Sequence, residues 1–177
     1  MKKPLYSVVL LSPSIKFQDS DYANFPAMMK FSDNIKERFE EAMKYQSELM
    51  KTYDDRKMGS QCPYLMIILD DCANIMGINS KESMLATYST YCRKMNVFIV
   101  ILQQQACLVN ITTRENATHV VLTAFDGLIE NLRKMIKEDE KELFSKAVDH
   151  CKTPFNFFVF NPLGNPSIWR GTINANP

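Results

Sequence analysis

Two adjacent carboxylates, Asp70 and Asp71, directly follow the apolar run YLMIIL at residues 64–69. Such a run is typical of a strand buried on both faces, and charges beside a core are costly unless they bind something. Carboxylate oxygens suit Mg²⁺ next to a nucleotide phosphate, so Asp70 is a candidate metal ligand and Asp71 a candidate to polarise an attacking water. The alternative is that one or both cap a following helix, because aspartate is a favoured N-cap.

Glutamines end the next apolar run, VFIVIL at residues 97–102, where turn residues would be ordinary. An amide at the same sheet edge as two carboxylates can hydrogen-bond a nucleophilic water or a terminal phosphate. We predict this role for Gln104, and we predict that Gln103 points into the packing. A solvated, glutamine-rich strand exit is the alternative.

An arginine, Arg114, stands in TTRENATHVVL, just before the apolar run at residues 119–123. On a loop at a subunit edge, its planar guanidinium could reach the phosphates held by a neighbouring subunit. An ordinary solvated arginine is the alternative. Arg93 and Lys94, which precede residues 97–102, have the same two interpretations.

Short apolar runs alternate with segments of helical periodicity. The runs lie at residues 5–11, 64–69, 97–102, 119–123 and 155–160, and the amphipathic segments lie at 31–50, 84–95 and 128–148. Apolar strands joined by helices belong to parallel sheets covered on both faces, so we predict an α/β fold with a mostly parallel sheet and right-handed crossovers. Residues 1–170 are predicted to form one domain and residues 171–177 a tail.

Composition and cysteine spacing exclude several classes of protein. The 177 residues are 46% hydrophobic and 23% charged with a formal net charge of +1, so no overall basic excess points to nucleic acid. The five cysteines form no CxxC and the two histidines no HxxxH, so reduced structural thiols are expected rather than a zinc site. The start, MKKPLYSVVLL, has no small-residue cleavage site, and no apolar stretch is long enough to span a bilayer.

The order of these motifs resembles the poxvirus-type DNA-packaging ATPases of the FtsK and HerA superfamily, which are P-loop NTPases with a RecA-like fold. The resemblance rests on VVLLSPS, LMIILDD, CRKMNVFIVILQQ and TTRENATHVVL, and FVFNPLGNPSIWRG is similar to the family's terminal strands. It implies that Asp70 is the Walker B aspartate that binds Mg²⁺ and that Asp71 is the catalytic acid. It also implies that Gln104 is the sensor and that Arg114 is a candidate trans-acting arginine.

The resemblance implies cofactors and partners as well. They are ATP and Mg²⁺, double-stranded DNA contacted without sequence preference, a homo-oligomeric ring, and a capsid or portal vertex. No membrane is implied, and the location would be the virion or the host cytoplasm. The basic side chains of the late helical segment, Arg133, Lys134 and Lys137, are candidates to line a DNA pore, and a solvated helix face is the alternative.

One motif of the family is absent from this sequence, because no GxxxxGK[ST] occurs in it. The amides and lysine of that P-loop hold the phosphates. In the family, the strand that leads into the loop lies between the equivalents of residues 97–102 and 119–123, so two unpaired strand edges are expected here. Three outcomes are open: these two strands pair with each other, another chain supplies the missing strand, or the isolated chain folds poorly.

We therefore predict a RecA-like fold that lacks its first strand and helix. The predicted function is a DNA-packaging motor ATPase, present as a fragment, a split product or a degenerate subunit, and whether this chain hydrolyses ATP is left open. An alternative is a non-catalytic subunit of a packaging ring or portal. A magnesium-dependent nuclease built on Asp70 and Asp71 would need further converging acids, for which only Glu82 and Asp126 are available.

Overall fold

The computed structural model forms two compact units. The N-terminal unit is Met1–Gln104 with Leu108–Glu115, and the C-terminal unit is Gln105–Cys107 with Asn116–Pro177. The prediction that residues 1–170 form a single domain stays a prediction. The structure describes residues 6–17, 19–76, 84–103, 109, 111–122, 138–153, 156–161 and 168–172.

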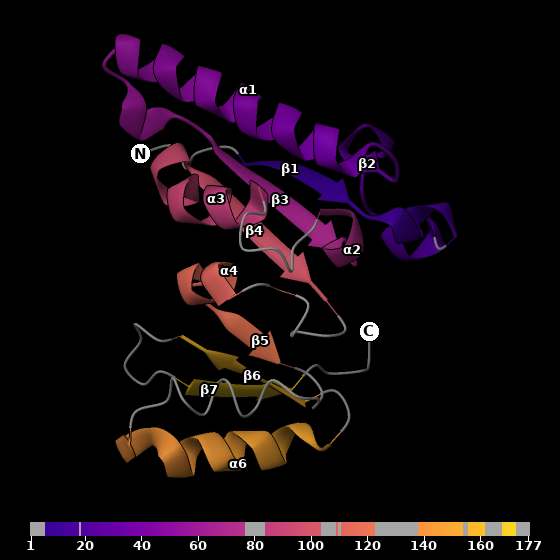
Figure 1. Ribbon diagram of the computed structural model, residues 1–177, viewed down its shortest axis with the longest axis vertical. Helices are drawn as coiled ribbons and strands as arrows, with labels where there is room; N and C mark the ends of the chain where they lie inside the picture. The colour runs from indigo at the N-terminus through magenta and orange to yellow at the C-terminus, as the bar shows by residue number, and fades with distance from the viewer. Residues whose placement is uncertain are drawn as a thin grey trace. The chain divides into compact units, whose positions relative to one another are not determined.

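A four-stranded parallel sheet forms the centre of the N-terminal unit (Figure 1). The strand order is β2-β1-β3-β4. Leu11 lies opposite Leu69, and Asp70 lies opposite Leu102, so the carboxyl ends of three strands meet at one edge. The predicted α/β fold with a mostly parallel sheet is confirmed. The strands are β1 (Tyr6–Leu11), β2 (Lys30–Phe31), β3 (Tyr64–Asp70) and β4 (Val97–Leu102).

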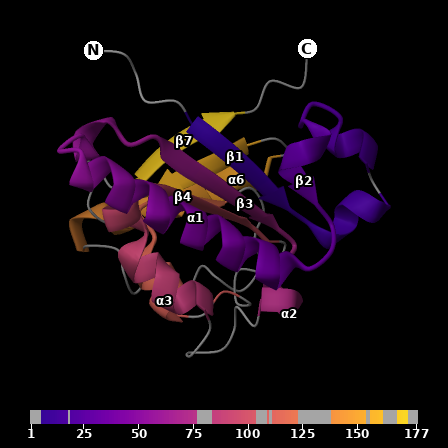
Figure 2. The same cartoon turned by 90° about the horizontal axis from the view of Figure 1, so that it is seen from above.

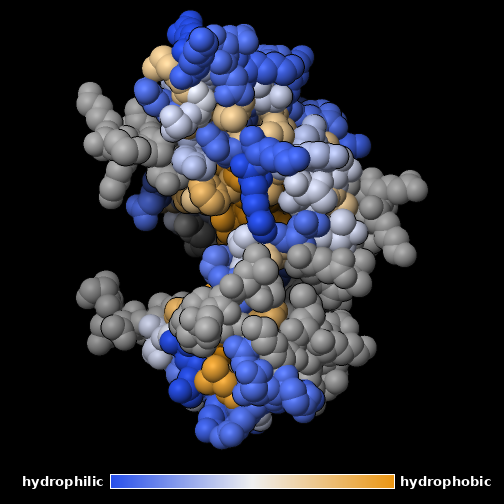
Figure 3. All heavy atoms as spheres, turned by 90° about the vertical axis from the view of Figure 1, so that its left-hand side faces the viewer, coloured by the Kyte–Doolittle hydropathy of each residue, from blue (hydrophilic) through white to orange (hydrophobic). Residues whose placement is uncertain are grey.

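Two helices, α1 (Ile35–Asp55) and α3 (Met84–Tyr91), pack on one face of this sheet (Figure 2). The ring of Phe39 meets that of Tyr88 edge to face, with centroids 5.6 Å apart. The outward face of α1, at the top of Figure 3, is hydrophilic. The core between helices and sheet contains Ile35, Phe39, Met43, Leu65, Ile67, Leu69, Leu85 and Val97.

The helix predicted over residues 31–50 is unbroken but begins at Ile35. Phe31 belongs instead to β2, where it pairs with Leu11. The chain turns between the two elements at Asn34, which has a left-handed φ of 46°. The helix predicted over residues 84–95 ends as α3 at Tyr91 and continues as a short 3₁₀ helix, η5 (Cys92–Met95).

An antiparallel sheet of order β5-β6-β7 forms the C-terminal unit with helix α6 (Lys141–Cys151). Phe144 of α6 packs edge to face on Phe158, with ring centroids 5.8 Å apart. The described part of the late helical segment begins at Glu138, so residues 128–137, with Arg133, Lys134 and Lys137, lie outside the described residues. The strands are β5 (Val120–Leu122), β6 (Asn156–Phe160) and β7 (Ile168–Thr172), and β7 runs two residues into the segment predicted as a tail.

Strands β4 and β5 belong to different sheets of the described residues. Within the described residues, β4 pairs with β3 alone and β5 pairs with β6 alone. Which of the three outcomes applies to residues 97–102 and 119–123 stays a prediction. A difference from the sequence analysis is that Arg114 lies in a short helix, α4 (Ile111–Asn116), where we expected a loop. No helix in the described part of the chain is long and apolar enough to cross a membrane.

Candidate functional site

Strand β3 carries Asp70 to the carboxyl edge of the parallel sheet. Side chains alternate along a strand, and Leu65, Ile67 and Leu69 fill the buried positions on the face that packs against α1. Asp70 therefore belongs to the opposite face, where it is partly buried. Ligands of open parallel sheets bind at this edge, so the fold places the carboxylate where a ligand is expected.

Two hydroxyl groups donate hydrogen bonds to the same oxygen of Asp70. The Ser12 Oγ lies 2.9 Å from Asp70 Oδ2, and the Tyr22 hydroxyl also donates to Oδ2. The short helix α2 (Ala73–Met76) follows, and its first hydrogen bonds run from the amides of Ile75 and Met76 to the Cys72 carbonyl. If Asp70 capped α2, its carboxylate would accept hydrogen bonds from backbone amides in the first turn of that helix. The hydrogen bonds found for its side chain come instead from the hydroxyls of Ser12 and Tyr22.

Asp71 differs from its neighbour in environment. Its φ of 50° lies in the left-handed region, its side chain is exposed, and its amide donates to the Leu102 carbonyl at 3.0 Å. A left-handed backbone is uncommon for residues other than glycine, and aspartate and asparagine tolerate it best. The pair thus consists of one fixed, partly buried carboxylate and one exposed to solvent.

The Cys72 thiol is fully buried beneath these carboxylates. Its Sγ donates to the carbonyls of Leu11 and Asp70, at 3.1 and 3.3 Å. Burial, and then the negative charge of Asp70, raise the pKa of this thiol to about 12. A thiol that stays protonated is a poor nucleophile and a poor metal ligand, which favours the structural role predicted for the cysteines.

Gln103 follows β4 directly, and its side-chain amide is buried. Within the part of the chain that the structure describes, neither its nitrogen nor its oxygen has a hydrogen-bond partner. Burial agrees with the prediction that Gln103 points into the packing. However, buried polar groups are nearly always bonded, so an amide with two unused atoms beside the Asp70–Leu102 pair fits a site that a further polar group completes. Gln104 itself lies outside the described residues.

Two of the three basic candidates, Arg93 and Lys94, lie away from the carboxyl edge of the parallel sheet. Arg93 and Lys94 are exposed residues of η5, which precedes β4. A six-residue strand is roughly 17 Å long, so they lie at the far end of β4 from the carboxylates. The backbone of Arg114 lies in α4, and its side chain is outside the described part of the structure.

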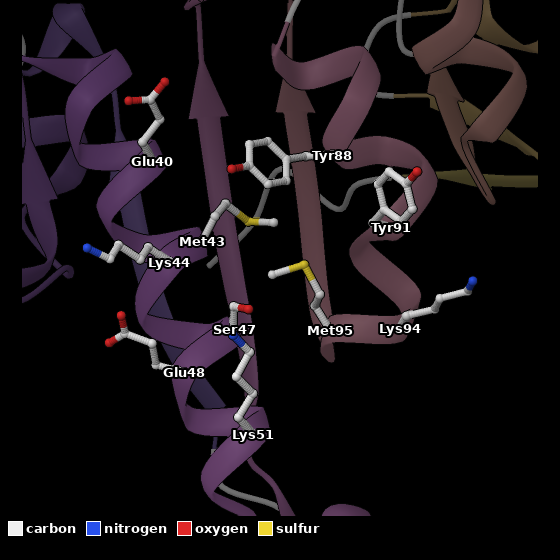
Figure 4. Close-up of a pocket in the computed structure, with 10 residues that line it drawn as sticks. All are labelled: Glu40, Met43, Lys44, Ser47, Glu48, Lys51, Tyr88, Tyr91, Lys94 and Met95. Atoms are coloured by element: carbon white, nitrogen blue, oxygen red, sulfur yellow. The ribbon is translucent and has the colours of Figure 1, made fainter. Parts of the chain in front are cut away.

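A groove of about 650 Å³ lies between α1 and the α3–η5 segment (Figure 4). Met43 and Met95 point toward each other across it, whereas Lys44 and Lys94 point outward. Neither Asp70 nor the other residues of the carboxyl edge line this groove, so it is separate from the candidate site.

A magnesium ion fits the donor set at the carboxyl edge. Within the described residues, no group of three or more His, Cys, Asp or Glu could hold a metal ion. Mg²⁺ is commonly bound through one or two carboxylates plus phosphate oxygens and water, and Asp70 with Asp71 offers that arrangement. A two-metal nuclease needs more acids, and both Glu82 and Asp126 lie outside the described residues.

The sequence analysis singled out the two aspartates as candidates but not Ser12 and Tyr22, whose hydroxyls donate to Asp70. Ser12 stands in VVLLSPS, and a hydroxyl directly after a strand that neighbours β3 was an available signal. Tyr22 offered none, because it is 48 residues from Asp70 and belongs to no strand.

The fold has relatives among solved structures. The genome packaging NTPase B204 from Sulfolobus turreted icosahedral virus 2, in complex with AMPPCP, is 12% identical with a TM-score of 0.54, over 94% of this chain and 82% of that chain. B204, the DNA-packaging ATPase from Sulfolobus turreted icosahedral virus, is 10% identical with a TM-score of 0.52, over 94% of this chain and 97% of that chain. At such identity, these likenesses establish the fold.

The sequence itself also matches a family. No match was found among curated proteins. A model of the family described as "Poxvirus A32 protein" matches residues 4–154. This match covers most of the 177 residues and includes every motif from VVLLSPS to TTRENATHVVL. The chain therefore belongs to the poxvirus A32 protein family, as its resemblance to the poxvirus-type packaging ATPases implied.

Proposed function

We propose that this chain is the larger part of a viral DNA-packaging motor ATPase, in which ATP hydrolysis drives double-stranded DNA into a capsid. Family membership supports a packaging ATPase. A solved structure of similar fold is a packaging NTPase in complex with AMPPCP, an ATP analogue. The observation that carries the proposal is the placement of Asp70 and Asp71 at the carboxyl edge of a parallel sheet, where such folds bind ligands.

Each residue at this edge has a role in the proposal. Asp70 holds Mg²⁺, and the bound ion would neutralise charge that develops on the phosphates. The exposed carboxylate of Asp71 accepts a proton from the attacking water. Gln104 senses the terminal phosphate and Arg114 reaches the phosphates held by a neighbouring subunit of a ring, as the resemblance implies.

The phosphates also need a loop that the printed sequence lacks, and a segment outside the 177 residues would supply it on a strand beside β4. Within the described residues β4 has one paired side only, so its other edge offers amides and carbonyls to an added strand. Phe98 and Leu102 of this strand are 47% and 48% exposed. Within the described residues the side-chain amide of Gln103 has no hydrogen-bond partner, so it adds a donor and an acceptor directly after the carboxyl end of β4.

A non-catalytic subunit of a packaging ring or portal is the second candidate function. The observation in its favour is the absence of GxxxxGK[ST] from the sequence. In both cases the partners would be DNA contacted through its phosphates and a capsid or portal, in the virion or host cytoplasm. The motor ATPase needs the Asp70 carboxylate for DNA packaging, whereas the non-catalytic subunit does not.

The test replaces Asp70→Asn in the genome that encodes the chain and measures DNase-protected DNA in assembled particles. The control is Asp55→Asn, which removes an exposed carboxylate at the end of α1. We expect Asp70→Asn to reduce protected DNA at least tenfold and Asp55→Asn to leave it unchanged, because only Asp70 would hold the ion. If Asp70→Asn particles contain as much protected DNA as the wild type, the motor ATPase proposal is wrong and the non-catalytic subunit is favoured.

A second measurement tests where the phosphate loop resides. A fluorescent ATP analogue with Mg²⁺ is titrated into the purified chain and into an Asp70→Ala variant. If the loop comes from outside the 177 residues, the folded chain alone binds no more tightly than the variant. Tight binding that disappears in Asp70→Ala would mean that the chain holds the phosphates by itself, and the split site would be wrong.

A further inference from the structure

We infer that Ser12 and Tyr22 are positioning residues for Asp70, whose hydroxyls hold carboxylate oxygen Oδ2 so that Oδ1 is presented to a cation. The inference rests on the proposed function, in which Asp70 binds Mg²⁺. It adds two residues to which neither the sequence analysis nor the family resemblance gave a role.

The position of Ser12 is set by its backbone, independently of its contact with the Asp70 carboxylate. It follows Leu11, which pairs with Leu69, so the parallel register places it beside Asp70. It is fully buried, and its amide donates to the Phe31 carbonyl at 3.0 Å. Its Oγ accepts from the Ser14 amide at 3.2 Å, which leaves the single hydroxyl proton for Asp70 Oδ2 at 2.9 Å.

Tyr22 approaches from a different element. It closes η2 (Asp19–Tyr22), in the segment that links β1 to β2, and its carbonyl accepts from the Phe25 amide at 3.0 Å. The Tyr22 hydroxyl lies 3.4 Å from Ser12 Oγ and donates to Asp70 Oδ2. An ionised carboxylate only accepts, so both hydroxyls are donors in this arrangement.

Both donors meet one oxygen, and this asymmetry carries the inference. Within the described residues, no hydrogen bond to Asp70 Oδ1 is found. A carboxylate that binds Mg²⁺ through one oxygen needs the other oxygen held, because free rotation would carry the ligand oxygen away from the ion. Hydrogen bonds to a metal ligand of this kind typically change metal affinity 10- to 100-fold.

The test compares five variants of the full chain by NMR: four in both readouts, and Asp70→Asn in the second. Tyr22→Phe and Ser12→Ala each remove one donor, Ser12→Thr keeps the hydroxyl, and Tyr91→Phe removes a hydroxyl from a tyrosine that is 52% exposed on α3. The first readout needs no metal: three-bond couplings to Cγ of Asp70 report its χ1 rotamer. We expect one rotamer in the wild type, Ser12→Thr and Tyr91→Phe, and averaged couplings in Tyr22→Phe and Ser12→Ala.

The second readout is line broadening of the amide signals of residues 70–72 by Mn²⁺ alone. We expect Tyr22→Phe and Ser12→Ala to need about tenfold more Mn²⁺ than the wild type for equal broadening. Ser12→Thr and Tyr91→Phe should behave as wild type, and Asp70→Asn should lose the effect. Circular dichroism verifies that each variant is folded.

The two readouts separate this inference from the proposed function. Averaged Asp70 couplings already in the wild type, or equal Mn²⁺ dependence in Tyr22→Phe, Ser12→Ala and wild type, would overturn the positioning role. Wild-type broadening that survives Asp70→Asn would instead overturn Asp70 as the metal ligand. In that case, couplings that become averaged only in Tyr22→Phe and Ser12→Ala would still support the positioning role.

Discussion

The amide of Asp71 donates a hydrogen bond to the carbonyl oxygen of Leu102, at an N···O distance of 3.0 Å. It continues the β3–β4 ladder past its last register pair, Asp70 with Leu102. Because the φ of Asp71 is 50°, the strand ends here in a defined left-handed turn. The end of β3 is thus held by β4 on one side and by Ser12 on the other. Backbone geometry at Asp71 can therefore be tested separately from its charge.

Asp71→Gly and Asp71→Ala both remove the carboxylate but differ in how they tolerate the left-handed backbone. We expect Asp71→Ala to have a free energy of unfolding about 1 kcal/mol lower than Asp71→Gly, measured in urea, because alanine pays the steric cost that glycine avoids. The control is Lys51, an exposed position inside α1. There we expect Lys51→Ala to have the higher free energy of unfolding and Lys51→Gly the lower, because alanine favours a helix. Equal stability of the two Asp71 variants would show that the turn relaxes.

The partnerless amide of Gln103 predicts a stabilising substitution. Gln103→Leu removes two buried polar atoms that make no hydrogen bond among the described residues, so we expect the free energy of unfolding to rise by about 1 kcal/mol. Gln61→Leu, at an exposed position, should change it by less than about 0.5 kcal/mol. Thermal unfolding followed by circular dichroism measures both. A loss of stability in Gln103→Leu would reveal a partner for the amide in the folded chain.

Gln46 predicts the opposite result, because the nitrogen of its buried side-chain amide donates two hydrogen bonds. It is 2% exposed, and its Nε2 donates to the carbonyls of Pro63 and Met95, at 2.9 and 3.1 Å. These bonds join α1 to the entry of β3 and to η5. Gln46→Met keeps the volume but leaves two carbonyls unpaired, so urea unfolding should show a loss of about 2 kcal/mol. A change as small as that of Gln61→Met would contradict this account.

The buried thiol of Cys72 predicts a dependence of stability on pH. Its pKa is raised from 9.0 to about 12 in the folded chain, by burial and by the charge of Asp70, so the folded chain binds this proton more tightly than the unfolded chain does. Its contribution to stability is complete below pH 9 and is lost as the pH rises toward 12, at no more than about 1.4 kcal/mol per pH unit.

The corresponding experiment compares the wild type with Cys72→Ala by urea unfolding at about pH 8 and about pH 10. We expect the free energy of unfolding to fall less in Cys72→Ala than in the wild type over this interval, because the variant has no thiol to ionise when it unfolds. Parallel losses in the two proteins would mean that the Cys72 thiol ionises as easily in the folded chain as in the unfolded one.

Local patterns predicted the parallel sheet well. The runs at residues 5–11, 64–69 and 97–102 became β1, β3 and β4 with boundaries shifted by at most one residue, because strand formation there follows from consecutive apolar side chains. Phe31 shows where such patterns fail. Its spacing fits the helix that follows, yet it pairs with Leu11 as part of β2, because pairing with β1 decided its conformation.

By itself, the sequence determined that residues 5–11, 64–69 and 97–102 form strands, that Asp70 and Asp71 end a buried strand, and which family the motifs resemble. These features depend on residues close together in the chain. Only the tertiary structure decided that the hydroxyls of Ser12 and Tyr22, 58 and 48 residues away, bond one oxygen of Asp70. Among the described residues, it alone left the Gln103 amide buried without a partner. The reason is that hydrophobic periodicity encodes which face of an element is buried, whereas contacts between distant residues depend on how the elements pack.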